Sequence, residues 1–264
     1  MKLAIALAER ADAPAVWPGL GRRATEPLRL IIVPDAARMR QLSGGRAPAW
    51  GAGIALPGSR TIMVRADAQD PLTVLRHELA HLALRRAVRV RLPRWFDEGY
   101  AAYAAGEWGR LEALKLNLSV VRRGTPELAE LDGALRGRSP AAEASYALAM
   151  SAVMELARRN PTGSLDPLMA LLSGGEEFNA AVVRTTGLTE GRFAAEWRRS
   201  VHRRYGLLSW MLAGGLWAAV AIGVILAAAA RRRADRPRRR ALDDGWVIPD
   251  EEVSPELDPP REHV

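Results

Sequence analysis

Residues 70–81 read DPLTVLRHELAH, and this stretch decides both the local fold and the chemistry of the chain. Asp70 followed by Pro71 is a typical helix start, because an aspartate can accept hydrogen bonds from the first backbone N–H groups and proline fits the first helical position. The sequence therefore predicts a helix that begins at Pro71. In that helix His77 and His81 lie one turn apart on the same face.

Two imidazoles in this arrangement suit two ligands of one tetrahedral zinc ion. Glu78 lies beside them, where a carboxylate can accept the proton of a metal-bound water. The chain has four histidines and no cysteine, so any metal must be bound by histidine and carboxylate side chains. Two histidines with a purely structural role are the alternative. His202 and His263 lie far along the chain, and we expect neither to be a ligand.

Residues 92–103 read LPRWFDEGYAAY and supply candidates for a third ligand. A catalytic zinc site needs three protein ligands and an open position for water. Asp97 and Glu98 both lie on a second helix, which we expect to begin at Pro93, and spacing alone does not distinguish them. Asp97 could instead orient a histidine through its second ring nitrogen.

The two motifs together, HELAH and PRWFDEGYA, resemble the gluzincin metallopeptidases, in particular the bacterial peptidase MA-like family. The resemblance covers about residues 28–205, and its specific motifs lie within 75–103. It implies a zincin-like α+β catalytic domain that binds Zn²⁺ through His77, His81 and Glu98, which selects Glu98 over Asp97.

The chain also departs from its better-known relatives. It has 16 residues between the second histidine and the glutamate, fewer than the aminopeptidases of this clan, and it has no GxMEN-type exopeptidase motif. We therefore expect an endopeptidase that acts on peptide or protein substrates.

The resemblance further implies a mechanism in which Glu78 acts as general base and then as general acid. Tyr146 is the candidate hydrogen-bond donor to the tetrahedral intermediate, with a packing role as its alternative. Tyr100 and Tyr103 are expected to pack, as are Trp95 and Phe96. The segment 61–65 is either an ordinary strand or a strand that binds extended substrate.

The coarse pattern is α+β, with strands first and a mostly helical remainder. A strand is expected at 28–34 and a hairpin at 53–64. The first ten residues either belong to the folded domain or follow an export signal that lies upstream. Further helices are expected at 139–160, 165–173, 176–186 and 189–204.

Residues 207–230 carry no charge, and a helix of that length would extend about 36 Å, against about 30 Å of bilayer hydrocarbon. The sequence thus predicts a C-terminal transmembrane helix, with a buried helix as the alternative. Seven arginines and one aspartate follow at 231–240, and an acidic, disordered tail is expected at 241–264. This distribution predicts a single-pass protein of the cell membrane whose domain, 1–206, lies outside the cytoplasm.

The net charge of +8 averages a basic domain, the arginine block and the acidic tail. It indicates contact with a lipid bilayer more than with nucleic acid, and no nucleic-acid partner is expected. The favoured function is a membrane-anchored zinc metallopeptidase. The alternative is a catalytically inactive, peptidase-like scaffold at the membrane.

Overall fold

The computed structural model describes residues 2–13, 15–23, 27–48, 51–107, 125–135, 140–205 and 214–244. The chain divides into two units, Met1–Trp210 and Met211–Val264. The first unit contains the strands and most of the helices, and the second contains one long described helix.

The first unit holds two small sheets. β1 (Ala15–Trp17) and β2 (Gly21–Arg23) form an antiparallel hairpin. In the other sheet, β5 (Thr61–Arg65) lies between β3 (Arg29–Val33), to which it is parallel, and β4 (Gly53–Leu56), to which it is antiparallel. The strand expected at 28–34 and the hairpin expected at 53–64 are therefore confirmed.

Nine helices are described in the first unit, and most begin where capping residues or prolines predict. Asp70 accepts hydrogen bonds from the backbone N–H groups of Leu72 and Thr73, so the predicted start at Pro71 is confirmed. These helices are α1 (Lys2–Asp12), α2 (Ala36–Leu42), α3 (Pro71–Ala87), α4 (Arg94–Ala105), α6 (Leu128–Ala134), α7 (Pro140–Arg159), α8 (Asp166–Ser173), α9 (Phe178–Thr186) and α10 (Glu190–Tyr205).

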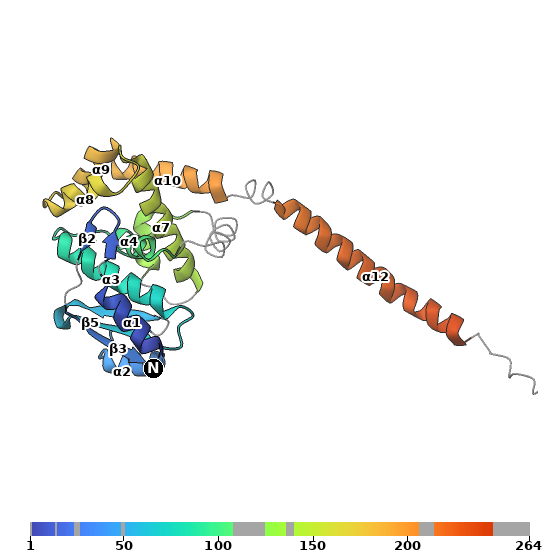
Figure 1. Ribbon diagram of the computed structural model, residues 1–264. Coiled ribbons are helices and arrows are strands. Elements are labelled where there is room, and N and C mark those ends of the chain that lie inside the picture. The colour runs from blue at the N-terminus through green and yellow to red at the C-terminus, as the bar shows by residue number, and fades with distance from the viewer. Residues whose placement is uncertain are drawn as a thin grey trace, which may run out of the picture. The chain divides into compact units, whose positions relative to one another are not determined.

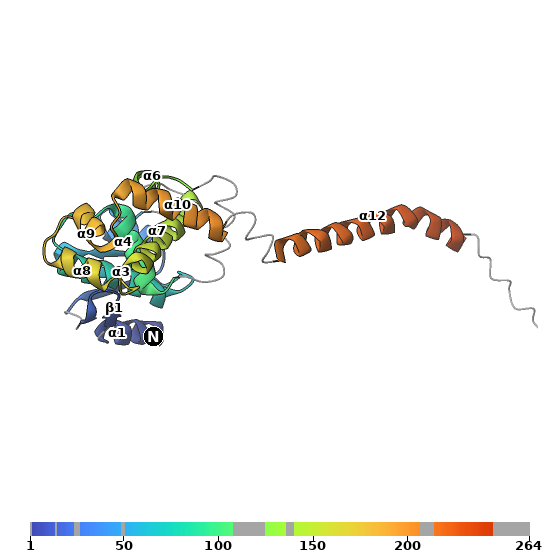
Figure 2. The ribbon, with the colours of Figure 1, turned by 90° about the horizontal axis from the view of Figure 1, so that it is seen from above.

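The main core forms where α3 meets the three-stranded sheet on one side and α4 on the other (Figure 1). α4 packs in turn against α7, and Gly99 allows the close approach: a Cβ there would lie 2.5 Å from the carbonyl oxygen of Ala149. α1 packs against α3 through Leu7 and Ala11, so the first residues belong to this folded unit. Figure 2 shows α1 and β1 on the opposite side of the unit from α6 and α10.

The transmembrane helix predicted at 207–230 is not supported by the structure of the second unit. α12 (Leu216–Asp244) has 29 residues and continues from the apolar stretch through the arginine block, with Pro237 inside it. Its uncharged part, 216–230, would extend only about 22 Å, short of the roughly 30 Å of bilayer hydrocarbon. Within the described ranges, no helix is both long and apolar enough to cross a membrane.

The predicted fold class is therefore wrong: the described chain is mainly helical, its sheets have two and three strands, and a transmembrane helix is not supported. The expected single-pass location in the cell membrane fails for the same reason. Residues 207–213 of the predicted span, Ser139 at the start of the helix expected at 139–160, and the tail 245–264 lie outside the described residues.

Candidate metal centre

The centre begins with the two histidines of α3. The Nε2 atoms of His77 and His81 lie 3.2 Å apart, as expected for side chains one helical turn apart. Both side chains are largely buried, with 14% and 10% of their surface exposed. The sequence prediction that these two residues share one face is confirmed.

Glu98 of α4 completes a triangle of donor atoms. Its Oε2 lies 3.7 Å from Nε2 of His77 and 3.5 Å from Nε2 of His81. A tetrahedral zinc ion with ligand distances of about 2.0–2.2 Å requires ligand atoms about 3.3–3.6 Å apart. The three side chains thus form a buried group that could hold a metal ion.

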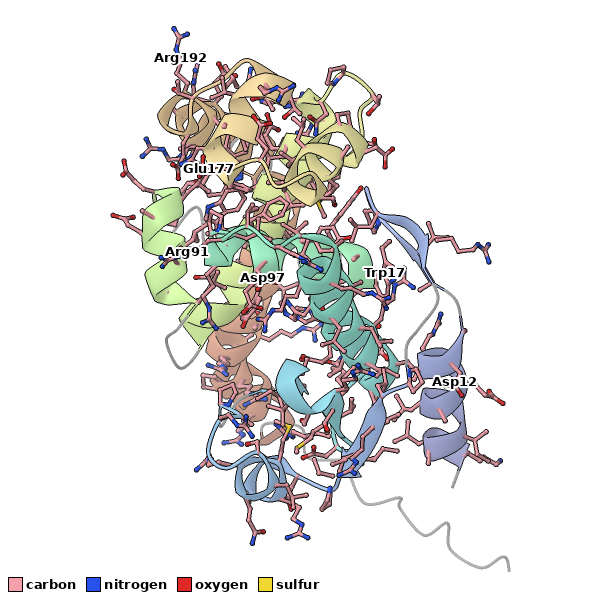
Figure 3. The ribbon with its side chains drawn as sticks, turned by 90° about the vertical axis from the view of Figure 1, so that its left-hand side faces the viewer. Asp12, Trp17, Arg91, Asp97, Glu177 and Arg192 are labelled. Atoms are coloured by element: carbon pink, nitrogen blue, oxygen red, sulfur yellow. The ribbon has the colours of Figure 1, made fainter. Side chains whose placement is uncertain are left out.

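Two more carboxylates contact the outer ring nitrogens of the histidines. Oδ1 of Asp97 lies 2.7 Å from Nδ1 of His81, and Oε1 of Glu107 lies 2.7 Å from Nδ1 of His77. A carboxylate at Nδ1 accepts a hydrogen bond from the Nδ1–H group and so leaves the lone pair on Nε2, which is the form that binds a metal. Asp97, labelled in Figure 3, therefore occupies the orienting position that the sequence left open, and Glu98 faces both Nε2 atoms.

Glu107 was missed by the sequence reasoning. It follows Gly106, which ends α4 in the left-handed conformation with a φ of 77° and turns the chain. Such a turn is typical of glycine after a helix. An acidic residue directly after that glycine was the available signal, but its contact with His77 depends on how α4 packs against α3.

These contacts set the charge states of the donors. Burial alone would lower the pKa of His81, but the Asp97 and Glu98 carboxylates raise it to about 9. Burial likewise opposes protonation of His77, yet the carboxylates of Glu107 and Glu98 raise its pKa well above the ordinary value. Burial would raise the pKa of Glu98, but the two histidines lower it strongly, so this carboxylate is ionised.

Glu78 lies next to the donor triangle and beside β4. The side chain is buried, and a Cβ at Gly53 would lie 2.9 Å from its Oε1. Burial raises the pKa of Glu78, opposed by the two histidines and by the backbone N–H of Ala55. A carboxylate with a raised pKa is suited to accept a proton and return it near neutral pH.

Tyr146 of α7 also lies at the centre. Its ring centroid is 6.4 Å from that of His77, and its pKa is raised by burial and then by the Glu98 carboxylate. The phenol therefore keeps its proton and can act as a hydrogen-bond donor. The structure places this predicted residue near the donor triangle.

The other aromatic residues that the sequence singled out, Trp95, Phe96, Tyr100 and Tyr103, have structural roles. Trp95 and Phe96 are buried and contact the rings of Phe178 and Phe193, so the expected core role is confirmed. The hydroxyl of Tyr100 donates to the carbonyl oxygen of Pro18 at 3.0 Å. Tyr103 packs against the core.

Two further expectations are settled by position. β5 pairs with strands on both sides, so the segment 61–65 is an ordinary sheet strand and has no free edge for substrate. His202 lies on α10 and is not part of the donor group, while His263 lies outside the described residues.

The chain was also compared with known proteins. No protein-family model and no curated protein sequence matches it. The function of the chain is therefore inferred from the geometry of the centre itself.

Proposed function

We propose that this chain is a zinc-dependent metallopeptidase that hydrolyses peptide bonds. The observation that carries the proposal is the donor triangle of His77, His81 and Glu98, with the carboxylate of Glu78 beside it. Three nitrogen and oxygen donors of tetrahedral spacing favour zinc and leave a fourth position for water.

When bound, zinc would polarise the substrate carbonyl and lower the pKa of a bound water. Glu78 then accepts the proton of the attacking water and delivers it to the leaving amine. Asp97 and Glu107 hold the two imidazoles in the tautomer and orientation that metal binding requires. Tyr146 donates a hydrogen bond to the oxygen that gains negative charge.

The edge of β4 supports an extended peptide as substrate. In the described residues β4 pairs with β5 alone, so its other edge offers backbone groups to a further strand. The carbonyl of Ala52 accepts from Arg65 of β5, so the backbone groups of Gly53 and Ala55 point to the outer edge. Glu78 interacts with Ala55 on this edge, so a peptide paired there passes the proposed base.

The test uses the full chain loaded with zinc. Metal content is measured by elemental analysis, and cleavage of a peptide library and of an unfolded protein is followed by mass spectrometry of new amino termini. We expect one zinc per chain and cleavage that Glu78→Gln abolishes without loss of metal. Glu190→Gln, at the exposed start of α10, is the matched control and keeps full activity.

Two results would overturn the proposal in different ways. A folded wild-type chain that does not retain zinc would refute the metal centre. One zinc per chain with no cleavage by wild type would refute the enzyme and favour the non-catalytic scaffold.

A further inference from the structure

The two oxygens of Glu98 have different partners. Oε2 faces the Nε2 atoms of both histidines, whereas Oε1 lies 3.3 Å from Nη2 of Arg94. Arg94 lies four residues before Glu98, which places both side chains on one face of α4. The glutamate is largely buried, and the arginine is 42% exposed.

The backbone at Arg94 is itself held in place. The N–H groups of Arg94 and Trp95 donate to the two carboxylate oxygens of Asp132, at 3.3 and 2.7 Å. Asp132 belongs to α6 and caps α4 from outside, because Pro93 at the N-cap offers no side-chain acceptor. The guanidinium thus extends from a fixed helix start toward Oε1.

The two oxygens of Asp97 also have different partners. Its Oδ1 contacts His81, while Oδ2 lies 3.3 Å from Nη2 of Arg85. In both carboxylates one oxygen lies next to a histidine nitrogen and the other contacts an arginine. Of these two carboxylates, Glu98 is the one whose oxygen, Oε2, faces the Nε2 atoms of the histidines.

We propose that Arg94 is a positioning residue that keeps Oε1 of Glu98 away from the metal, so that the glutamate binds through one oxygen. Carboxylates bind metals through one or two oxygens, and a second oxygen would take the position that a catalytic zinc site keeps for water. A guanidinium paired with Oε1 favours the one-oxygen form because its positive charge attracts that oxygen. This inference rests on the metal-binding part of the proposed function and not on peptide cleavage.

The test compares zinc coordination in the wild-type full chain and in Arg94→Met, which keeps an aliphatic stem at that position. X-ray absorption of the zinc-loaded proteins gives the number of ligands, and the absorption spectrum after Co²⁺ substitution reports tetrahedral geometry. We expect four ligands and an intense tetrahedral Co²⁺ band in wild type. Arg94→Met should gain an oxygen ligand and lose most of that band.

Two further variants separate positioning from general electrostatics. Arg94→Lys keeps a cation near Oε1 and should restore most of the wild-type spectrum. Arg85→Met removes the guanidinium from Asp97, which contacts no metal, and should leave the ligand number unchanged. Circular dichroism checks that each variant is folded.

The proposal is overturned if Arg94→Met retains wild-type coordination, if Arg85→Met changes it equally, or if wild type binds no metal. A wild-type chain with four zinc ligands and no peptidase activity would refute the proposed function alone. The coordination measurements would still decide the role of Arg94.

Discussion

Nδ1 of His77 and Oε1 of Glu107 lie 2.7 Å apart, although 30 positions separate these residues in the sequence. The contact joins the first predicted ligand to a residue just beyond the end of α4. Removing an orienting carboxylate of this kind typically weakens metal binding about 10–100-fold. We expect that loss for Glu107→Ala, measured by competition with a chromophoric chelator. Glu107→Gln, which can still accept from Nδ1–H, should lose less, and equal affinity of all three proteins would contradict the assignment.

Metal affinity should rise with pH. The pKa values of His77 and His81 are raised in the metal-free protein, so protons compete with the metal for both imidazoles. Each histidine that binds must release its Nε2 proton, and binding therefore strengthens as the pH rises from about 6 to about 8. Chelator competition at several pH values, with proton release measured calorimetrically, checks the sign. Affinity that is flat or falls over this range would show that the histidines are not ligands.

Tyr146→Phe removes the proposed hydrogen-bond donor and leaves the ring that packs beside His77. If the hydroxyl stabilises the developing negative charge, turnover should fall by about 100-fold. Zinc content should not change, because the donor triangle is intact. Tyr103→Phe is the matched control and should keep wild-type turnover. Equal rates for wild type and Tyr146→Phe would show that the hydroxyl is not a catalytic donor and that Tyr146 has only a packing role.

Gly99→Ala should destabilise the protein through the contact between α4 and α7. The new Cβ would lie 2.5 Å from the carbonyl oxygen of Ala149 and 2.9 Å from Cγ2 of Val153. Overpacking of this kind costs about 1–3 kcal/mol. Denaturant unfolding measures the loss, with Gly191→Ala as control, since a Cβ there meets nothing within 4 Å. Unchanged stability of Gly99→Ala would mean that the two helices separate without cost.

Glu155 should stabilise the protein at neutral pH and cease to do so in acid. Burial would raise the pKa of Glu155, but hydrogen bonds from Arg158 and Arg159 lower it overall. A carboxyl whose folded-state pKa is lowered contributes stability above its unfolded-state pKa and loses it as the pH falls. Glu155→Gln should therefore cost about 1–3 kcal/mol at pH 7 and progressively less in acid, by denaturant unfolding at each pH. A cost independent of pH would refute the ionic interpretation.

Sequence patterns predicted the parts of the centre that depend on local geometry. His77 and His81 share a face because helical periodicity alone requires it, and Asp70 with Pro71 predicted where that helix begins. The choice between Asp97 and Glu98 as the ligand depends on how α4 packs against α3. The spacing of residues in the sequence carries no information about that packing. The contact of Glu107 with His77 depends in addition on the turn at Gly106.

Local patterns left the position of β5 open and gave the wrong end for the last helix. The central position of β5 follows from its pairing with β3, which precedes the hairpin in the sequence. The sequence predicts that the last helix ends with the uncharged run, at Ala230. The helix instead continues through the arginines to Asp244. Arginine is a good helix former, so charge alone does not end a helix.

The donor atoms, their orienting carboxylates and Glu78 all lie within residues 77–107, on α3, on α4 and in the turn that follows α4. Contacts of such short sequence separation require little loop-closure entropy. Residues 77–107 precede α7 to α10 in the chain, so all the side chains of the centre on α3 and α4 have been synthesised before those helices.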